Sequence, residues 1–441
     1  MRPVELIEVL QARDRRVNRQ QELLRQYGCA LICFTMNIAG PVKNSDEIRW
    51  GFRYGCKLVR RQLDRIKAKL LHWEECNEVT GNEAFFVVDA DADRLKQLMV
   101  ELEDNLELGR LFDLDVLTVD GRKLERSVER CCLICGAPGK ACARSRAHSV
   151  PELQEKTRGI LENAHERWKQ ETVAELACRA LLYEACTTPK PGLVDCRNSG
   201  SHRDMDLYSF LSSAAALQPY FASCVKIGIE TRSQSPQDTF AALRWPGKLA
   251  ELRMLEVTGG VNTHKGAIFT MGILCGALGR LDDALWQEPV NVLWECAEMT
   301  SGVTSRELQS VQSAETAGER LYEKFGATGI RGQVEAGLPA VLHHGLPVLE
   351  QELLKGCSLE EAGCSALLAL IAQTQDTNLL KRGGPEGQQW AAEQAERLLG
   401  SSDRKLLEEL DHAFIQRNLS PGGAADLLAV CYFLHFVKHE M

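Results

Sequence analysis

The sequence has no apolar run long enough to cross a bilayer, which excludes a membrane-spanning helix. Its first residues, MRPVELIEVLQARDRRVNRQQELL, mix both charges throughout, so we do not expect them to act as a signal peptide. The chain is therefore expected to be cytoplasmic, with its 17 cysteines as reduced thiols. An excess of positive charge is missing as well. The formal net charge of −9 argues against a general nucleic-acid binder, although local basic patches remain open.

The chain contains enough apolar residues to form more than one hydrophobic core. It has 441 residues, 44% of them apolar and 26% charged, without repeats or low-complexity tracts, so two or three globular domains are expected. The two halves differ in pattern, and we place the domain boundary between residues 1–165 and residues 166–441. The charged, helical segment Pro151–Gln170 is interpreted as a connector with no sign of burial in either core.

Strand-like segments recur only in the first half. Cys29–Ile38, Ala84–Ala92 and Leu111–Gly121 are rich in β-forming residues, and helical patterns around Leu58–Trp73 and Leu95–Leu106 lie between them. This alternation predicts an α/β or α+β domain. After residue 165 the strand signals nearly vanish, which predicts an all-α domain. Its expected helices are Glu171–Cys186, Leu207–Lys226, Trp245–Leu255, Gly266–Leu285, Ser305–Phe325, Leu359–Ala372, Gln388–Leu399 and Ala424–Phe436.

The segment Thr187–Asp206, TTPKPGLVDCRNSGSHRDMD, concentrates charged groups where prolines and glycines prevent one regular helix. Acids, a base and cations on a loop fixed by a preceding helix suit a site for a metal-chelated polyphosphate. The alternative is an ordinary polar surface loop. The candidate residues are the acids Asp195, Asp204 and Asp206, the base His202, and the cations Lys190, Arg197 and Arg203.

Four further loops of the second half place charged groups next to glycines. TGGVNTHKG precedes a small-residue helix, whose free N–H groups could bind an anion beside Lys265; an ordinary capped helix start is the alternative. Each loop alone is more simply structural, but five such loops in one helical domain favour a binding site. The residues they add are Asn262, His264, Lys265, Arg331, Glu335, Asp376, Arg382 and Asp426.

In the first half, GRLFDLDV places Asp113 and Asp115 alternately along a strand, so their side chains share one face. Two carboxylates so placed can hold one or two Mg²⁺ for phosphoryl or nucleotidyl transfer. The alternative, which composition alone favours, is the polar face of an exposed antiparallel strand. The turn TMNIAGPVKNS ends another strand and offers Lys43.

The cysteine-rich segment CCLICGAPGKACARSRAH allows two interpretations. Cys132, Cys135, Cys142 and His148 could be ligands of a structural zinc, although their spacing fits no standard template well. Alternatively, Arg144, Arg146 and His148 form a basic patch for phosphates, and the cysteines are packing residues. We favour the second interpretation slightly.

These motifs resemble two enzyme families. From Glu171 onward the chain is similar to the triphosphoribosyl-dephospho-CoA synthases that serve citrate lyase, and the first half resembles the apo-citrate lyase phosphoribosyl-dephospho-CoA transferases (holo-citrate lyase synthases). Together the matches cover nearly the whole chain, as in a fusion of the two. The second-half motifs are TPKPGLVD, NSGSHRDMD, GGVNTHKGAIF, TGIRGQVEAG, DTN with a following RGG, and SPGGAADLLA. The first-half motifs are RDRRVNRQ, TMNIAGPVKNS, GNEAFFVVDAD, GRLFDLDV and CLICGAPGKACARSRAHS.

The resemblance implies a two-step pathway. The second domain would join ATP to 3′-dephospho-CoA and release adenine. The first, nucleotidyltransferase-like domain would transfer phosphoribosyl-dephospho-CoA to a serine of the citrate lyase acyl carrier subunit and release pyrophosphate. Two alternatives stay open. One is the same chemistry for a related decarboxylase carrier protein, and the other is a non-catalytic adaptor that binds a carrier protein and CoA-like ligands.

Roles follow from that chemistry. In the first reaction, Asp195, Asp204 and Asp206 would serve as metal ligands or general base, with His202 as a second candidate base. In the second, Asp113 and Asp115 would hold Mg²⁺. Which acid acts as the base, the oligomeric state and any transfer between sites do not follow from the sequence. The metal ligands expected are Asp113, Asp115, Asp204 and Asp206. The substrate-binding residues expected are Lys190, Arg203, Asn262, His264, Lys265, Arg331, Asp376, Arg382, Lys43, Arg144, Arg146 and His148.

Overall fold

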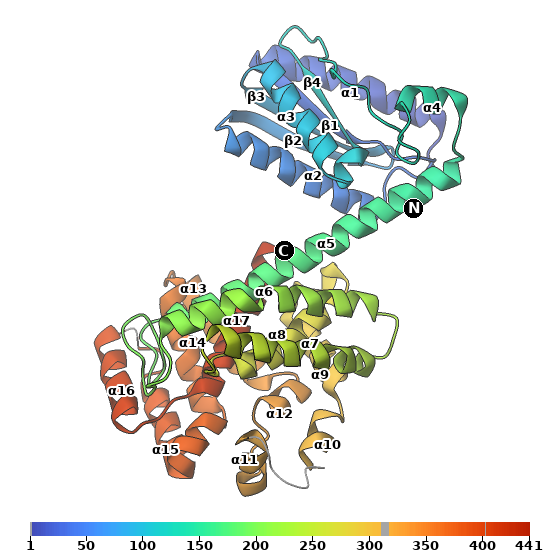
Figure 1. Cartoon of the computed structure of the whole chain (residues 1–441). Coiled ribbons are helices and arrows are strands. Elements are labelled where there is room, and N and C mark those ends of the chain that lie inside the picture. Colours follow the sequence, from blue (N-terminus) through green and yellow to red (C-terminus); the bar gives the residue numbers. More distant parts are fainter. Residues whose placement is uncertain (1, 310–316, 402) are drawn as a thin grey trace. The chain divides into compact units, whose positions relative to one another are not determined.

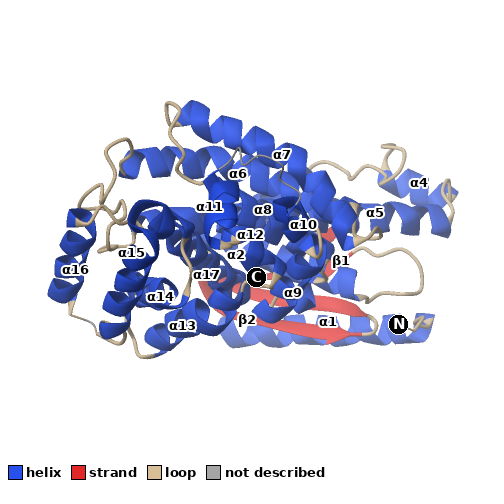
Figure 2. Cartoon of the chain, turned by 90° about the horizontal axis from the view of Figure 1, so that it is seen from below, coloured by secondary structure: helices blue, strands red, loops and turns tan. Residues whose placement is uncertain are grey.

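The computed structural model describes residues 2–309, 317–401 and 403–441, and the chain divides into two compact units. The first unit extends to Trp168, and the second is Lys169–Met441. Figure 1 follows the chain through both units, and Figure 2 shows the strands as one small sheet in an otherwise helical protein. Among the described residues, none of the helices combines the length and the apolar character that a bilayer crossing requires.

The first unit is built on a four-stranded antiparallel sheet in the order β2-β3-β1-β4. An all-antiparallel sheet with helices on its faces is an α+β arrangement, which selects one of the two predicted classes. The elements are α1 (Leu6–Tyr27), β1 (Ala30–Met36), α2 (Asp46–Arg65), β2 (Lys69–Glu78), β3 (Gly81–Asp89), α3 (Ala92–Asn105), the 3₁₀ turn η1 (Leu108–Leu111), β4 (Phe112–Leu117), α4 (Gly139–Ser145) and the start of α5 (Val150–Cys186).

Each face of this sheet carries its own apolar cluster, as strand alternation requires. On the face covered by α2 and α3, the ring of Phe34 stacks on Phe52 of α2 with centroids 5.0 Å apart. Gly55 allows α2 to approach this closely, because a Cβ there would lie 2.5 Å from the Phe34 ring. On the opposite face, Leu23 and Leu24 of α1 pack with alternate residues of β1 and β3.

The start of α5 belongs to the core of the first unit. Ile160 and Leu161 are buried in the cluster under α2 and α3, and Gly51 of α2 leaves room for Leu161. The expectation that Pro151–Gln170 is buried in neither core was therefore wrong, although the boundary between the two units, after Trp168, does fall within this segment. The charged residues of this stretch cover only its outer faces, and the apolar pair between them is packed.

The second unit is entirely helical in the described residues, as predicted. Several of its helices begin at ordinary capping residues; Ser235 and Ser358, for example, form capping boxes with Asp238 and Glu361. After the end of α5 the helices are α6 (Leu207–Glu230), α7 (Pro236–Val257), α8 (Lys265–Arg280), η2 (Asp283–Leu285), α9 (Pro289–Thr300), α10 (Thr304–Gln309), α11 (Ala317–Phe325), α12 (Gly329–Glu335), the π-turn η3 (Val341–Gly345), α13 (Leu346–Leu354), α14 (Leu359–Gln373), α15 (Thr377–Arg397), α16 (Arg404–Gln416) and α17 (Gly422–Glu440).

Two of the predicted helices need comment. The middle of the predicted helix Ser305–Phe325, residues 310–316, lies outside the described residues. The helix predicted at Gln388–Leu399 starts earlier, at Thr377, and is kinked at Gly384, which has a positive φ of 64° before Pro385.

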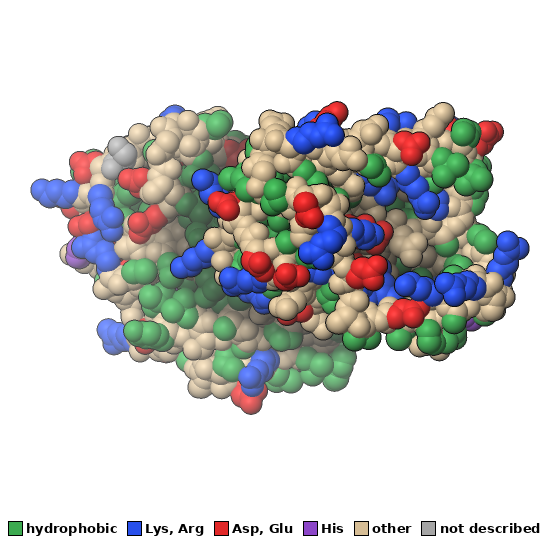
Figure 3. Space-filling view, turned by 90° about the horizontal axis from the view of Figure 1, so that it is seen from above, with side chains coloured by type: hydrophobic (Ala, Val, Ile, Leu, Met, Phe, Trp, Pro, Cys, Tyr) green, Lys and Arg blue, Asp and Glu red, His purple; other side chains and the backbone are tan. Residues whose placement is uncertain are grey.

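On the surface seen in Figure 3, Lys and Arg side chains are mixed with Asp and Glu side chains, in keeping with the modest net charge of −9.

Candidate active sites

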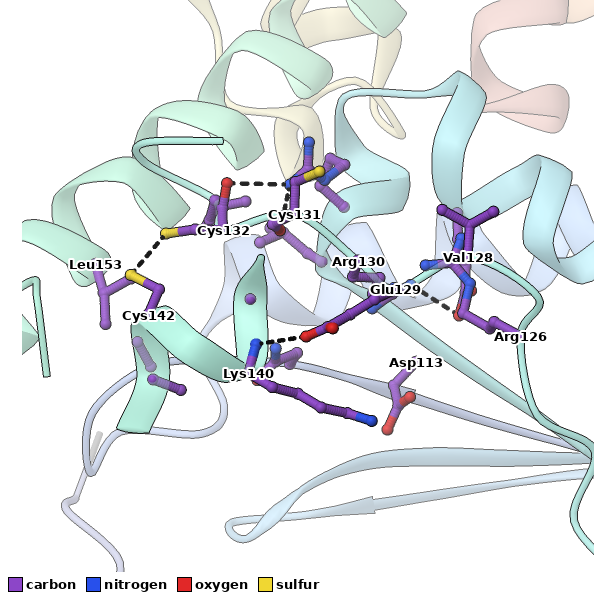
Figure 4. Close-up of a pocket in the computed structure, with 18 of the residues that line it drawn as sticks. Asp113, Arg126, Val128, Glu129, Arg130, Cys131, Cys132, Lys140, Cys142 and Leu153 are labelled. Atoms are coloured by element: carbon purple, nitrogen blue, oxygen red, sulfur yellow. Dashed lines mark hydrogen bonds and ion pairs between the residues drawn. The ribbon is translucent and has the colours of Figure 1, made fainter. Parts of the chain in front are cut away.

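A cavity of about 1140 Å³ in the first unit combines acidic and basic side chains. It lies beside β4 and the segment that leads from β4 to α5. Figure 4 shows the side chain of Lys140 extending toward Asp113 across this space. Mixed charge around a cavity of this size suits a ligand that carries phosphates and a metal ion. The charged lining residues include Lys96, Glu103, Arg110, Asp113, Asp115, Lys123, Arg126, Arg130, Lys140, Arg146 and His148.

Asp113 and Asp115 lie on one face of β4, as their spacing predicted. The register pairs them with Thr35 and Cys33 of β1, and Cys33 belongs to the apolar cluster beneath α1. Asp115 forms an ion pair with Lys123, with its Oδ2 2.5 Å from Nζ. Asp113 is exposed at the cavity. Two hard oxygen donors at alternate positions of a rigid strand fit a Mg²⁺ site.

The basic residues predicted near this site are not all brought together. Arg146 and His148 line the cavity, whereas Arg144 is exposed on α4 and does not contribute to the lining described. The Nζ of Lys43 donates to the carbonyl oxygen of Ile38 at 2.6 Å, and burial lowers the pKa of this lysine. Lys43 therefore holds the turn after β1 as well as supplying charge.

In the second unit, Asp195 and Asp411 hold the Thr187–Asp206 loop in place. The carboxylate of Asp195 is buried and accepts three backbone N–H groups, from Lys190, Arg197 and Asn198, at 3.1, 2.7 and 3.0 Å. Asp411, on α16, accepts the N–H of Gly192 at 2.9 Å and the side-chain amide of Asn198 at 2.8 Å. A carboxylate with this many N–H donors positions the loop rather than offering its oxygens to a ligand.

Lys190 is the most deeply buried cation of the loop, at 1% exposure. Its Nζ lies 2.6 Å from the Oε1 of Glu184 and 2.8 Å from the Glu184 carbonyl oxygen. Glu184 is near the end of α5 and is also buried. The ammonium group is thus neutralised from within the protein, as a buried charge must be.

A second polar group joins His202 to α15. Arg382 donates to Nδ1 of His202 at 3.3 Å and to the carbonyl oxygen of Ser201 at 2.9 Å, and His202 Nε2 lies 2.9 Å from the hydroxyl of Ser420. Burial, then the charge of Arg382, lowers the pKa of His202, so the imidazole is neutral near pH 7. Because Nδ1 then accepts from Arg382, the proton is on Nε2.

Asp204 and Asp206 have different surroundings although they are close in sequence. Asp206 caps α6, accepting the N–H of Ser209 at 2.9 Å, and this hydrogen bond holds the pKa of Asp206 below its usual value. Asp204 is exposed, and its charge acts on both His202 and Arg382, opposing the lowering of their pKa values. Arg203 beside it is exposed as well. Asp204 is therefore the loop carboxylate best placed to meet a ligand.

His264 is buried at the start of α8. Its Nδ1 lies 2.7 Å from the hydroxyl of Ser213, and Nε2 is buried without a hydrogen-bond partner among the residues described here. Burial, helped by the charge of Lys190, lowers the pKa of His264 to about 3, so the ring is neutral. A buried imidazole nitrogen without a partner is a group that a ligand can satisfy.

The helix start around His264 agrees in part with the sequence interpretation. The N-cap residue of α8 is His264, and the side-chain oxygen of Asn262 accepts the N–H of Lys265 at 3.1 Å, so Asn262 supports the helix start from just before the cap. Lys265 is exposed and pairs with Glu251 at 2.8 Å. Arg331 is partly exposed on α12.

Two more carboxylates meet where α8, α15 and α17 begin. Asp376 caps α15 by accepting the N–H groups of Asn378 and Leu379, and it also accepts the N–H of Ala424 in the first turn of α17. Asp426 packs against α8 so closely that a Cβ at Gly266 would lie 2.0 Å from its Oδ2. Burial raises the pKa of both Asp376 and Asp426, and nearby acidic groups add to the rise for Asp426. Carboxylates at helix N-termini complement the helix dipoles.

Sequence reasoning did not include Glu184 or Asp411 among the site residues. Both lie on the buried face of a helix: Glu184 continues the spacing of Ala177 and Ala180, and Asp411 lies between Leu407 and Phe414. A carboxylate at an apolar position of an amphipathic helix was the signal that could have found them.

Each unit thus carries a cluster of acids and cations of the kind that binds phosphorylated substrates, which defines the chain as a candidate group-transfer enzyme. Residues 170–441 match the family described as ATP:dephospho-CoA triphosphoribosyl transferase, and residues 4–164 match that described as apo-citrate lyase phosphoribosyl-dephospho-CoA transferase. The chain belongs to the family of transferases in which these two domains are fused.

Relatives support this assignment along the full length. A protein of Haemophilus influenzae named Protein CitXG is 38% identical, over 98% of this chain and 96% of its own. A Protein CitXG of Leuconostoc mesenteroides subsp. cremoris is 32% identical, over 97% and 96%. A probable 2-(5''-triphosphoribosyl)-3'-dephosphocoenzyme-A synthase of Citrobacter koseri is 43% identical, over 59% of this chain and 89% of its own.

Proposed function

We propose that this chain makes the citrate lyase prosthetic group and attaches it. The second domain joins ATP to 3′-dephospho-CoA, giving 2′-(5″-triphosphoribosyl)-3′-dephospho-CoA and adenine. The first domain transfers phosphoribosyl-dephospho-CoA from this product to a serine of the citrate lyase acyl carrier subunit, and pyrophosphate leaves. The observation that carries the proposal is the match of both domains, in one chain, to families with these two activities.

In the first reaction the 2′-hydroxyl of dephospho-CoA forms a bond to the ribose carbon of ATP that carries adenine, while the bond from this carbon to adenine breaks. The hydroxyl must lose its proton in this step. We assign Asp204 as the acceptor of that proton. Asp204 and Asp206 are both exposed, but Asp206 caps α6, and Asp195 is buried and accepts backbone N–H groups. Charge that develops on the ribose would be stabilised by the same carboxylate.

The triphosphate stays on the product, so it has to be held without being cut. Arg203 and Lys265 are exposed cations for this task, and Arg382 adds charge beside His202. Lys190 is sealed by Glu184, so we give it the role of fixing the loop. Mg²⁺, when bound, would neutralise phosphate charge.

In the second reaction the carrier serine attacks the α-phosphorus and pyrophosphate is the leaving group. This is nucleotidyl-transfer chemistry, and the first domain is nucleotidyltransferase-like in that sense. Asp113 and Asp115 would hold Mg²⁺, which when bound polarises the phosphates. Lys140 and Arg146 of the same cavity would bind the pyrophosphate oxygens.

Adenine release from ATP and 3′-dephospho-CoA by the purified chain tests the first step directly. Addition of apo-acyl carrier subunit should then give pyrophosphate and a carrier heavier by the phosphoribosyl-dephospho-CoA group. An adaptor without activity would release no adenine. If only a decarboxylase carrier protein were modified, the chemistry would stand and the client would change.

A further inference from the structure

Four metal-ligating side chains of the first unit converge in space: Cys132, Cys135, Cys142 and His148. One ligand atom of each lies within 4.8 Å of all the others. The sulfur of Cys142 is 3.4 Å from that of Cys132 and 4.0 Å from that of Cys135. Tetrahedral zinc with Zn–S bonds of about 2.3 Å separates its sulfurs by about 3.8 Å. The observed distances bracket that value and are far longer than a disulfide bond.

The backbone between the ligands makes a turn suited to a metal-bound thiolate. The N–H of Ile134 points to the sulfur of Cys132, with the two atoms 3.4 Å apart, and Gly136 takes a positive φ of 73°. The N–H of Cys132 donates to the carbonyl oxygen of Ala137 at 2.6 Å, which closes the turn. A sulfur that accepts a backbone N–H is stabilised in the thiolate form that zinc requires.

His148 supplies a further, independent observation. Its Nε2 is buried and has no hydrogen-bond partner in the described part of the chain, which a metal ion would remedy. A second Cys/His/Asp/Glu group found among the described residues, Glu350 with His435 and His439, is different, because Lys438 already neutralises Glu350 at 3.0 Å.

We propose that Cys132, Cys135, Cys142 and His148 bind one structural zinc ion. Three thiolates and an imidazole form a soft donor set that suits zinc better than Mg²⁺. Because all four positions are filled by protein, no site remains for a substrate or a catalytic water. The interpretation favoured from sequence, which gave His148 to phosphate binding, is replaced; Arg146 remains available at the cavity.

The surrounding segment buries little apolar surface: Leu124 is packed in the core, and the ion pairs of Arg126 and Arg130 with Glu103 add polar contacts. Between β4 and α5 the only helix is α4, which has seven residues and buries none of them. Metal ligation is a common way to fold such a segment. Gly139, at the start of α4, fits so tightly that a Cβ would lie 2.8 Å from the carbonyl oxygen of Arg130, so the two sides of the loop are already in contact.

Zinc at this place would also shape the wall of the cavity. Lys140 follows the turn, its N–H donates to Glu129 at 2.9 Å, and its side chain extends toward Asp113 (Figure 4). Cys132 and Cys142 line the same cavity. Loss of zinc is therefore expected to abolish carrier modification and spare adenine release. This consequence rests on the proposed function, whereas the zinc site itself does not.

Metal analysis of the purified full-length chain tests the site. We expect one zinc per chain, lost in Cys135→Ser and in Cys142→Ser and kept in the matched control Cys131→Ser, whose exposed thiol is outside the group. Cobalt exchanged into the wild-type protein should give the visible and near-ultraviolet absorption of tetrahedral thiolate coordination. This measurement needs no variant, so it still tests the site if a variant fails to fold. Metal-free wild-type protein with full stability, or a disulfide between any two of these cysteines, would overturn the proposal.

Discussion

The carboxylate of Asp376 accepts a hydrogen bond of 2.9 Å from the backbone N–H of Ala424 while it also caps α15, so one side chain serves the N-termini of two helices. Asp376→Ala would leave three backbone N–H groups without their acceptor. We expect a loss of about 2–4 kcal/mol in the free energy of unfolding. The exposed cap Asp403, which serves only Lys405, is the control, and Asp403→Ala should cost about 1 kcal/mol. Equal losses in urea titrations would contradict the dual role.

The buried His264 predicts a pH dependence of stability. Its pKa is about 3 in the folded protein against 6.5 in the unfolded chain, so between these values only the unfolded state binds the proton. Stability is therefore complete above pH 6.5 and falls as pH is lowered toward 3. From pH 7 to 5.5 the loss should be about 1 kcal/mol. His264→Gln should remove this part of the pH dependence of the unfolding free energy. His412→Gln, at an exposed position, should leave it unchanged.

Asp204 and Asp206 should respond differently to the same substitution. Asp204→Asn removes an exposed charge beside His202 and Arg382 and should lower adenine release at least about 100-fold without loss of stability. Asp206→Asn keeps a good helix cap and should retain most of the activity. Steady-state adenine release by both variants checks this. The assignment fails if Asp204→Asn is as active as wild type.

Asp113→Asn should separate the two half-reactions. We expect pyrophosphate release and carrier modification to fall at least about 100-fold, because a carboxylate at this cavity is needed for the metal-assisted step. Adenine release should be unchanged, since this residue belongs to the other domain. Asp91→Asn, which keeps a capping side chain at the start of α3, is a matched control for both assays. A variant that loses both activities would refute the two-site scheme.

The burial of Ile160 and Leu161 predicts where the chain can be divided. A fragment ending at Trp168 keeps both residues and should fold, whereas one ending at Lys156 loses both. Each such side chain contributes about 2–4 kcal/mol, so the shorter fragment should be largely unfolded by circular dichroism. The complementary fragment should begin at Lys169, whose Nζ lies 2.6 Å from Asp283. Cooperative unfolding of the shorter fragment would show that the pair is dispensable.

The fold was predictable where one pattern dominates a segment. Three of the four strands are apolar and buried, and they were predicted. The fourth, β2, was partly taken for a continuation of a helix over Leu58–Trp73. As an edge strand it pairs only with β3 and has no fully buried residue, so its sequence lacks the apolar alternation of a half-buried strand. Helices α1, α4, α9, α12, α13 and α16 were missed as well.

The site was predictable as a set of loops, but not in the division of labour within it. The sequence identifies Asp195, Asp204 and Asp206 as acids near each other. Only the structure shows that Asp195 and Asp206 accept backbone N–H groups while Asp204 is exposed. Hydrogen bonds between residues far apart in the chain, such as those of Asp411 to the loop, depend on tertiary packing and have no local signature.

The course of α5 has a consequence for how this fusion survives in a cell. Proteases cut chains at exposed loop tips and seldom within intact helices. Here the division between the two units, after Trp168, falls inside a helix that runs from Val150 to Cys186. The junction is thus expected to resist proteolytic cleavage. The two domains would then be made and degraded together, and the cell would contain equal numbers of both.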